Sequence, residues 1–270
     1  MRLPFQAAAP AREYRQPARS PVPELDGVDV AAVYRGARTG GDFFEFLGVG
    51  DSRLLVLLLD IAGKREEALH IAAGVQDRFR ELAPQKFRAD DLNEAEAVTE
   101  TLIDLNQAVI RMAGGVRCAP GFLGCYNRDL GTITYVNAGH TPALLRDGND
   151  VMQLESNGLP LGLFSHATHE AQLGVLSPGA TLLLVSKGLV ESRSGREEFG
   201  IQRVREVLGA ANSGSAESTC HAVLEAVQKF VEQSRGFQIP GFGWSHNAET
   251  GDRRALGRND ATTLALVRKR

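Results

Sequence analysis

The chain has 270 residues, of which 43% are hydrophobic and 23% are charged, and its formal net charge is -3. A chain of this length can bury one large core, so we expect a single domain with a tail rather than two domains. The charge balance gives no electrostatic footprint for nucleic acid, although the last three residues, 268–270, are basic.

Cysteine usage and hydropathy indicate a cytoplasmic protein. Three cysteines, Cys118, Cys125 and Cys220, have no CxxC spacing and cannot all pair within one chain, which suits a reducing compartment. No apolar run approaches the roughly 20 residues of a membrane helix, and no apolar stretch follows the first arginine. We therefore expect neither a membrane anchor nor secretion.

The first 24 residues have the composition of a flexible arm. They contain five prolines and four arginines but few large apolar side chains. The domain is therefore expected to span residues 25–270.

Three strands and two helices are predicted next. Apolar residues alternate over 28–34, and two apolar runs, 42–49 and 53–59, form a hairpin. The second run contains LLVLLL without polar alternation, so both of its faces should be covered. Helical spacing follows over 68–82, where Pro84 is expected to end the helix, and again over 91–113.

The rest of the chain predicts a meander of short strands, two helices and a final strand. Strands in blocks with helices in pairs favour an α+β fold with largely antiparallel sheets over a βαβ alternation. The expected strands are 121–127, 132–137, 143–145, 151–154, 181–185 and 262–267, and the expected helices are 201–208 and 217–233.

A long connection precedes the final strand. Residues 234–259 exceed an ordinary loop, which indicates a functional or disordered segment. Trp244 within it is either a partner anchor or a side chain that packs back on the domain.

Polar residues lie at the ends of several apolar strands. Asp42 and Glu45 belong to GGDFFE, Asp60 follows LLVLLL, and Asn259-Asp260 precedes the final strand. Taken separately, each has an ordinary explanation as a solvated hairpin acid, a helix cap or a turn residue. None is persuasive alone.

The order of these motifs is more specific than any one of them. GGDFFE, DIAGK, a helix pair, NAGHTP, LVSKGLVES and NDATTLALVR follow one another along the chain. This order resembles the PPM family of metal-dependent serine/threonine protein phosphatases, in the bacterial branch related to stage II sporulation E (SpoIIE) and RsbU. The resemblance covers about residues 25–270.

The resemblance implies an αββα sandwich of two stacked sheets flanked by helix pairs, with two Mn²⁺ or Mg²⁺ ions held between the sheet edges. It implies that a metal-bridging hydroxide attacks phosphoserine or phosphothreonine of a small regulatory partner, typically an anti-sigma-factor antagonist. On the matching positions Asp42 would hold metal through or beside water, Asp60 would bridge both ions, and Ile61 would offer its carbonyl. Hard divalent cations prefer such oxygen ligands.

Two positions depart from the family pattern. Lys187 stands where the family has the aspartate of an Asp-Gly step, and Asn259 stands where it has a final aspartate. An ammonium about 4 Å from a divalent ion repels it by several kcal/mol at an effective dielectric of about 20. We therefore expect at most one tightly bound Mn²⁺ or Mg²⁺, with Glu45 or Asp260 as candidate substitute ligands.

The role of Lys187 stays open between two alternatives. It could pair with Asp60 or Asp260 in place of the missing cation, because buried acids need a partner. It could instead point to solvent, because lysine stems extend easily into water.

Two functional hypotheses remain. One is a working phosphatase with one metal or a substitute ligand, and the other is a pseudophosphatase that binds or scaffolds a phosphoprotein. A receiver domain also places an acid and a lysine at strand ends, but Asp60 and Lys187 lie about 127 positions apart across a meander, whereas receivers alternate βα. We favour loss or severe weakening of catalysis. The oligomeric state stays open, a homodimer included.

The histidines are expected to be structural. His140 in NAGHTP fits a turn histidine bonded to backbone. His166 and His169 would have ligand spacing with Glu170 only on a helix, and the nearby Pro160 and Gly162 indicate a loop.

Overall fold

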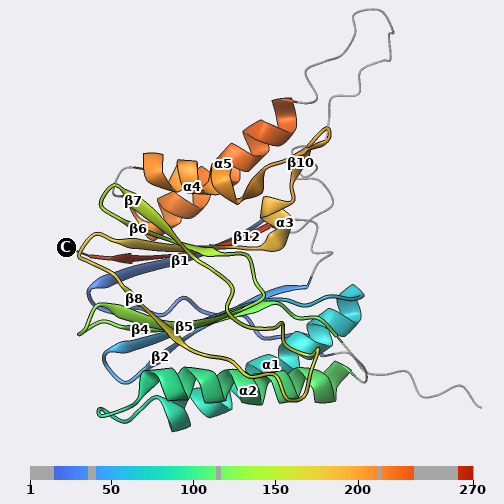
Figure 1. Ribbon diagram of the computed structural model, residues 1–270, viewed down its shortest axis with the longest axis vertical. Coiled ribbons are helices and arrows are strands. Elements are labelled where there is room, and N and C mark those ends of the chain that lie inside the picture. Colours follow the sequence, from blue (N-terminus) through green and yellow to red (C-terminus); the bar gives the residue numbers. More distant parts are fainter. Residues whose placement is uncertain (1–14, 36–40, 114–116, 212–213, 234–260, 270) are drawn as a thin grey trace, which may run out of the picture.

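The computed structural model describes residues 15–35, 41–113, 117–211, 214–233 and 261–269. Two antiparallel sheets lie face to face, and helices cover the outer face of each (Figure 1). The prediction of an α+β sandwich with αββα layers is confirmed.

The first sheet, which we call sheet A, has the strand order β1-β12-β9-β6-β7, and sheet B has the order β2-β3-β4-β5-β8. The strands are β1 (Val28–Arg35), β2 (Asp42–Val49), β3 (Arg53–Asp60), β4 (Gly121–Asn127), β5 (Thr132–Ala138), β6 (Ala143–Asp147), β7 (Asp150–Leu154), β8 (Gln172–Val175), β9 (Thr181–Val185), β10 (Arg193–Ser194), β11 (Glu197–Glu198) and β12 (Ala261–Arg268). The helices are α1 (Arg65–Lys86), α2 (Glu94–Ala113), α3 (Lys187–Val190), α4 (Gly200–Ala210) and α5 (Ala216–Gln233).

Three apolar clusters hold the four layers together. One lies between α1, α2 and sheet B, the second lies between the two sheets, and the third lies between sheet A and α3 to α5. Strand β3 contributes to the first two clusters from its opposite faces, and it lies between β2 and β4. The prediction that LLVLLL is covered on both sides is therefore confirmed.

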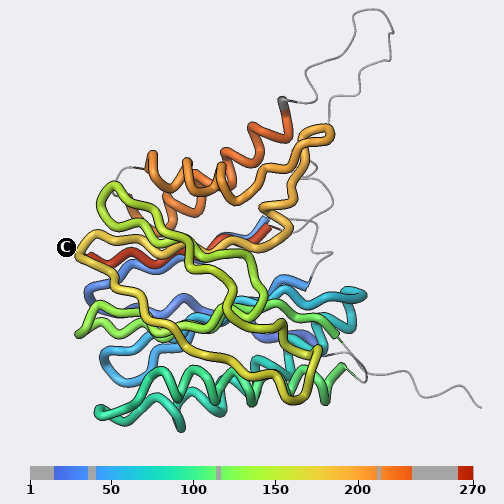
Figure 2. Tube along the Cα trace, in the orientation of Figure 1, coloured from blue at the N-terminus to red at the C-terminus, as the bar shows by residue number. Residues whose placement is uncertain are grey.

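The predicted single meander is wrong. Strands β4 and β5 belong to sheet B, but the chain then crosses to sheet A, where β6 pairs with β7 and with β9. Alternation of apolar residues looks the same in either sheet, so the sequence pattern could not place this crossing. Sheet A also pairs the first strand with the last, and Figure 2 shows their blue and red traces side by side.

Helix α1 continues past Pro84 to Lys86, two residues beyond the predicted end. Proline removes one backbone donor, and this loss is tolerable in the last turn, where the amide of Phe87 still reaches the carbonyl of Ala83.

In the described part of the chain no helix combines the length and the apolar character needed to cross a membrane.

The described part of the N-terminal arm is docked on the domain. Ala18 exchanges two hydrogen bonds with the side chain of Gln76 on α1, and Ser20 Oγ donates to the carbonyl of Phe44 on β2. Arg15 forms an ion pair with Asp77. Residues 15–22, which we call the strap, therefore do not follow the expectation of a flexible arm.

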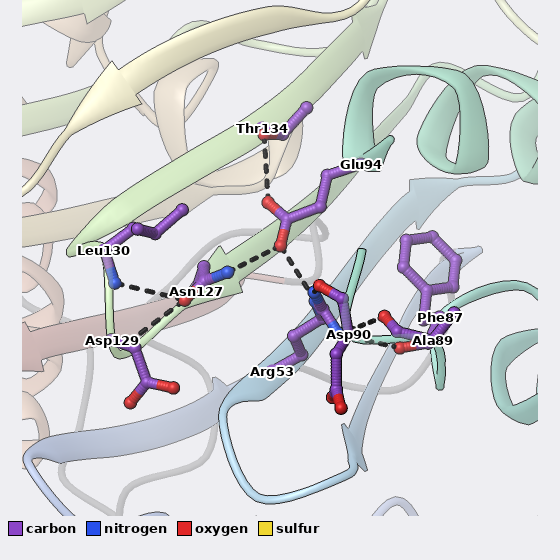
Figure 3. Close-up of polar contacts among 9 residues, drawn as sticks. All are labelled: Arg53, Phe87, Ala89, Asp90, Glu94, Asn127, Asp129, Leu130 and Thr134. Atoms are coloured by element: carbon purple, nitrogen blue, oxygen red, sulfur yellow. Dashed lines mark hydrogen bonds and ion pairs between the residues drawn. The ribbon is translucent and has the colours of Figure 1, made fainter. Parts of the chain in front are cut away.

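A buried ion pair fastens the connection between α1 and α2 to sheet B (Figure 3). Arg53 Nε lies 2.8 Å from Glu94 Oε1, and the two side chains are only 8% and 11% exposed. The guanidinium also donates to the backbone carbonyls of Phe87, Ala89 and Asp90. Glu94 in addition accepts from Asn127 and Thr134. We call this group the Arg53 latch.

Candidate functional site

Asp42 and Asp60 are neighbours across the β2-β3 ladder. Asp42 opens β2, Asp60 ends β3, and the two residues are register partners. Side chains alternate along a strand, so Asp42 shares the face of Phe44, which packs against the cluster between the sheets. Thr262 Oγ1 on β12 donates to Asp42 Oδ2 at 2.8 Å. The site therefore lies where an end of sheet B meets sheet A.

The backbone beside Asp42 comes unusually close to the next strand. The amide of Ile61 donates to the carbonyl of Gly41 at 3.0 Å. A Cβ atom at Gly41 would lie 1.9 Å from the carbonyl oxygen of Ile61, which is a steric overlap that any residue other than glycine would create. Glycine is therefore required at this position for the approach of these two segments.

Asp60 is a carboxylate in a partly dehydrated position. Burial raises the pKa of Asp60 above its ordinary value, the charge of Lys187 acts to lower that pKa, and the charge of Glu191 raises it further. The ammonium therefore compensates only part of the burial cost, and a bound cation would be favourable here.

Lys187 forms an ion pair with Glu191, whereas the sequence left open a pair with Asp60 or with Asp260, of which Asp260 lies outside the described residues. Lys187 Nζ lies 3.4 Å from Glu191 Oε1 one turn further along α3, and the two side chains are 57% and 45% exposed. The alternative of a lysine that points to solvent describes this side chain better. The positive charge of Lys187 nevertheless acts to lower the pKa of Asp60.

Strand β9 ends at Val185, because the backbone then turns at Ser186 into α3. Ser186 holds this turn: its amide donates to the carbonyl of Thr262, and its Oγ accepts from the amide of Thr262. Lys187 is then the first residue of α3, two positions after the last residue of the fully buried strand β9.

The structure places Glu45 away from the Asp42-Asp60 pair. Glu45 is three residues along β2 and therefore on its other face, where it is fully buried. Its carboxylate accepts from Gln76, Ser20 and Arg80, with Arg80 Nη2 3.0 Å from Oε1. This carboxylate is already compensated, so we do not retain it as a substitute metal ligand.

Two predicted positions, Asn259 and Asp260, lie outside the described residues, as does Trp244. Across the described ranges, no cluster of three or more His, Cys, Asp or Glu side chains is arranged to hold a metal ion.

The histidines are where the sequence predicts them. His140 is buried, and its Nδ1 lies within hydrogen-bonding distance of Thr141. His166 and His169 lie in the connection between β7 and β8 rather than on a helix.

Three further residues near the site were not predicted to belong to it: Thr262, Glu191 and Cys118. Thr262 donates a hydrogen bond to Asp42, and the charge of Glu191 raises the pKa of Asp60. The pKa of the Cys118 thiol is raised by burial and by the charge of Asp60. Glu191 could have been found from its spacing, because it follows Lys187 by one helical turn. Thr262 had no such signal, because it looks like any threonine in a buried strand.

The four-layer fold is that of PPM (PP2C) phosphatase domains. The chain belongs to the stage II sporulation protein E (SpoIIE) family, whose sequence model matches residues 50–237. The predicted family is thereby confirmed.

Similar proteins come from several bacteria. Protein IcfG of Synechocystis sp. is 24% identical over 217 residues, which cover 73% of this chain and 34% of IcfG. The RsbU and RsbW domains of Rv1364c from Mycobacterium tuberculosis match with a TM-score of 0.69 and 24% identity, over 91% of this chain and 62% of that one. The PP2C phosphatase domain of SpoIIE from Bacillus subtilis, solved with a fragment of its regulatory domain, matches with a TM-score of 0.65 and 15% identity, over 91% and 64% of the two chains. The chain thus spans about a third of the curated relative.

PPM phosphatases use Mg²⁺ or Mn²⁺. The donors present here fit such an ion in type, because Asp42 and Asp60 are paired in register and the Ile61 carbonyl is adjacent to Asp60. They are few in number, and an ammonium lies within electrostatic range of Asp60.

Proposed function

We propose that this SpoIIE-family domain binds phosphoserine or phosphothreonine of a regulatory partner protein and that its hydrolytic activity is weak or absent. The supporting observation is that the charge of Lys187 acts on Asp60, and the resemblance to the family implies a carboxylate at the position of Lys187. A cation there opposes a second divalent ion and favours a phosphate.

Metal binding in this proposal rests on Asp42 and Asp60, with the carbonyl of Ile61 as a further oxygen ligand. A bound Mn²⁺ or Mg²⁺ would supply positive charge to a phosphoryl oxygen and lower the pKa of a water. The protein itself contributes the orientation of Asp42 through Thr262, and it contributes Lys187 as a phosphate contact. Lys187 is more than half exposed, so its ammonium can exchange Glu191 for a phosphate oxygen.

The proposed partner is a phosphorylated antagonist of an anti-sigma factor in a cytoplasmic partner-switching system. Support comes from the SpoIIE family assignment and from the similar RsbU and RsbW domains, which occur together in one protein. Cys118, Cys125 and Cys220 are free thiols, which agrees with a reducing compartment.

Calorimetric titration with Mn²⁺ tests the metal part of the proposal. We expect at most one tight equivalent per chain, lost in Asp60→Asn. The Lys187→Asp, Asn259→Asp double variant should gain a second equivalent, because it restores both acids of the family pattern. Two tight equivalents in the wild-type chain would contradict the proposal.

Phosphatase assays test the catalytic part. Hydrolysis of p-nitrophenyl phosphate and of a phosphoserine peptide should be near background in the wild type and should rise in the double variant. Each increment of about 1.4 kcal/mol in transition-state stabilisation raises the rate tenfold. Vigorous wild-type activity that Asp60→Asn abolishes would instead favour a working phosphatase.

Phosphate recognition has a separate test. A phosphoserine peptide should bind more tightly than its unphosphorylated form, and Lys187→Ala should weaken the phosphorylated form alone. Arg196→Ala is a matched control, because Arg196 is an exposed cation in the turn between β10 and β11. Equal affinity for the two peptides would remove Lys187 from any recognition role.

A further inference from the structure

A pocket of about 710 Å³ adjoins Asp42 at the side of the two sheets. Its walls come from the edge strands β1 and β2, the first turns of α1 and the strap. Asp42 belongs both to the lining of this pocket and to the candidate metal site, so the two are adjacent. A volume of several hundred Å³ accommodates a few side chains of a bound ligand.

The strap is fastened to strand β2 by two hydrogen bonds of Ser20, one of them to the buried Glu45. Ser20 Oγ lies 2.7 Å from the carbonyl oxygen of Phe44 and 3.0 Å from Glu45 Oε2. Glu45 is fully buried and also binds Gln76 and Arg80 of α1. A buried carboxylate with several donors holds its neighbours in fixed positions, so the pocket is built into the fold.

The lining combines apolar surface with positive charge. Val22, Phe44 and Leu69 contribute apolar side chains, and Val22 is 42% exposed. The basic residues of the lining are Arg19 and Arg65, both at exposed positions. Asp42 is the acidic residue of the lining, and it is also a residue of the candidate metal site.

We propose that this pocket binds the residues that flank the phosphorylated residue of the partner, with an apolar side chain against Val22 and an acidic side chain at Arg65. The proposal rests on the proposed function, because the phosphate must lie near Asp42 for its flank to enter the pocket. Charge complementarity selects an acidic flank, and the exposed apolar lining selects an apolar neighbour. Arg65 and Val22 are thus specificity-determining residues for the partner.

Four labelled peptides of equal length test the proposal with the full chain by fluorescence anisotropy. Two carry phosphoserine, one flanked by leucine and aspartate and the other by glycine and lysine, and two are the unphosphorylated counterparts. Mn²⁺ is present, because the proposed function gives it a role in phosphate binding, and mass spectrometry of the peptides after the titration establishes that the phosphate is retained. We expect the apolar-acidic phosphopeptide to bind about tenfold more tightly than the glycine-lysine phosphopeptide, which corresponds to about 1.4 kcal/mol.

Three variants assign this preference to the pocket. Arg65→Glu and Val22→Asp should each reduce the preference to less than about threefold, because each adds repulsion to an acidic flank. Arg205→Glu makes the same charge change on an exposed position of α4 and should leave the preference unchanged. Thermal unfolding curves establish that each variant remains folded.

The outcomes separate this inference from the proposed function. If both phosphopeptides bind equally and more tightly than their unphosphorylated forms, the pocket proposal is overturned and the proposed function stands. If phosphorylation has no effect on binding, both fail. If the chain dimerises in light scattering and Val22→Asp disrupts the dimer, a second copy occupies the pocket and the proposal is likewise overturned.

Discussion

Replacement of Arg53 by methionine should be among the most destabilising single substitutions in this domain. The change keeps an apolar stem but leaves Glu94, which is 11% exposed, without its guanidinium partner. Loss of one partner of a buried ion pair costs about 3–5 kcal/mol. The carbonyls of Phe87, Ala89 and Asp90 also lose their donor, so we expect the upper part of that range. Urea denaturation of the wild type and the variant, extrapolated to water, measures the difference.

Two controls isolate the effect of burial. Lys86→Met removes a cation that pairs with Glu100 at 2.6 Å, in a pair whose side chains are 22% and 52% exposed, and it should cost less than about 1 kcal/mol. The Arg53→Met, Glu94→Gln double variant should recover part of the loss, because no uncompensated charge remains. A free energy of unfolding for Arg53→Met within about 1 kcal/mol of wild type would refute the reasoning.

Three further predictions concern the site and its surroundings. Gly41→Ala should lower both the melting temperature and the Mn²⁺ affinity, because its Cβ would overlap the carbonyl oxygen of Ile61; unchanged calorimetry would contradict this. Thr262→Val should cost about 1 kcal/mol in urea denaturation and weaken Mn²⁺ binding, because Asp42 loses its donor; a variant with wild-type metal affinity would exclude a positioning role. Burial lowers the pKa of His140 from 6.5 to about 4, so the unfolded chain binds the extra proton between these values. Stability should therefore fall as the pH decreases from 6.5 to 4, by at most about 3 kcal/mol, and this decrease should be smaller in His140→Gln. Parallel pH profiles for the two proteins would show that His140 is not the group responsible.

The helix pair and most strands could be predicted from periodicity, because each buries one face or both. Distribution of the strands over two sheets could not, since a strand has the same pattern in either. The strap was missed because its prolines and arginines suggest a chain that cannot pack. Its backbone and Ser20 instead meet polar partners of α1 and β2, among them the buried Glu45. Such contacts leave no periodic signal.

The candidate site was predictable to the extent that local sequence determines it. Asp42 and Asp60 lie at strand ends that a hairpin must bring together, so their pairing followed from the chain alone. The hydrogen bond between Asp42 and Thr262 joins residues 220 positions apart, and nothing local indicates it. The orientation of the Lys187 side chain depends on whether a helix begins at that residue. Helix α3 has only four residues, which is too short for a helical period of apolar residues to appear in the sequence.

Pairing of β1 with β12 has a consequence for the order in which this domain is made. Strand β12 lies between β1 and β9, so a chain that has been synthesised only as far as α5 has no partner for β1 within sheet A. Sheet B and its two helices contain only residues 42–175 and can pair beforehand. Because Thr262 completes the surroundings of Asp42, a nascent chain on the ribosome cannot present the finished site to a partner before its last strand emerges. Folding of this domain is therefore expected to end, rather than begin, with the completed surroundings of Asp42.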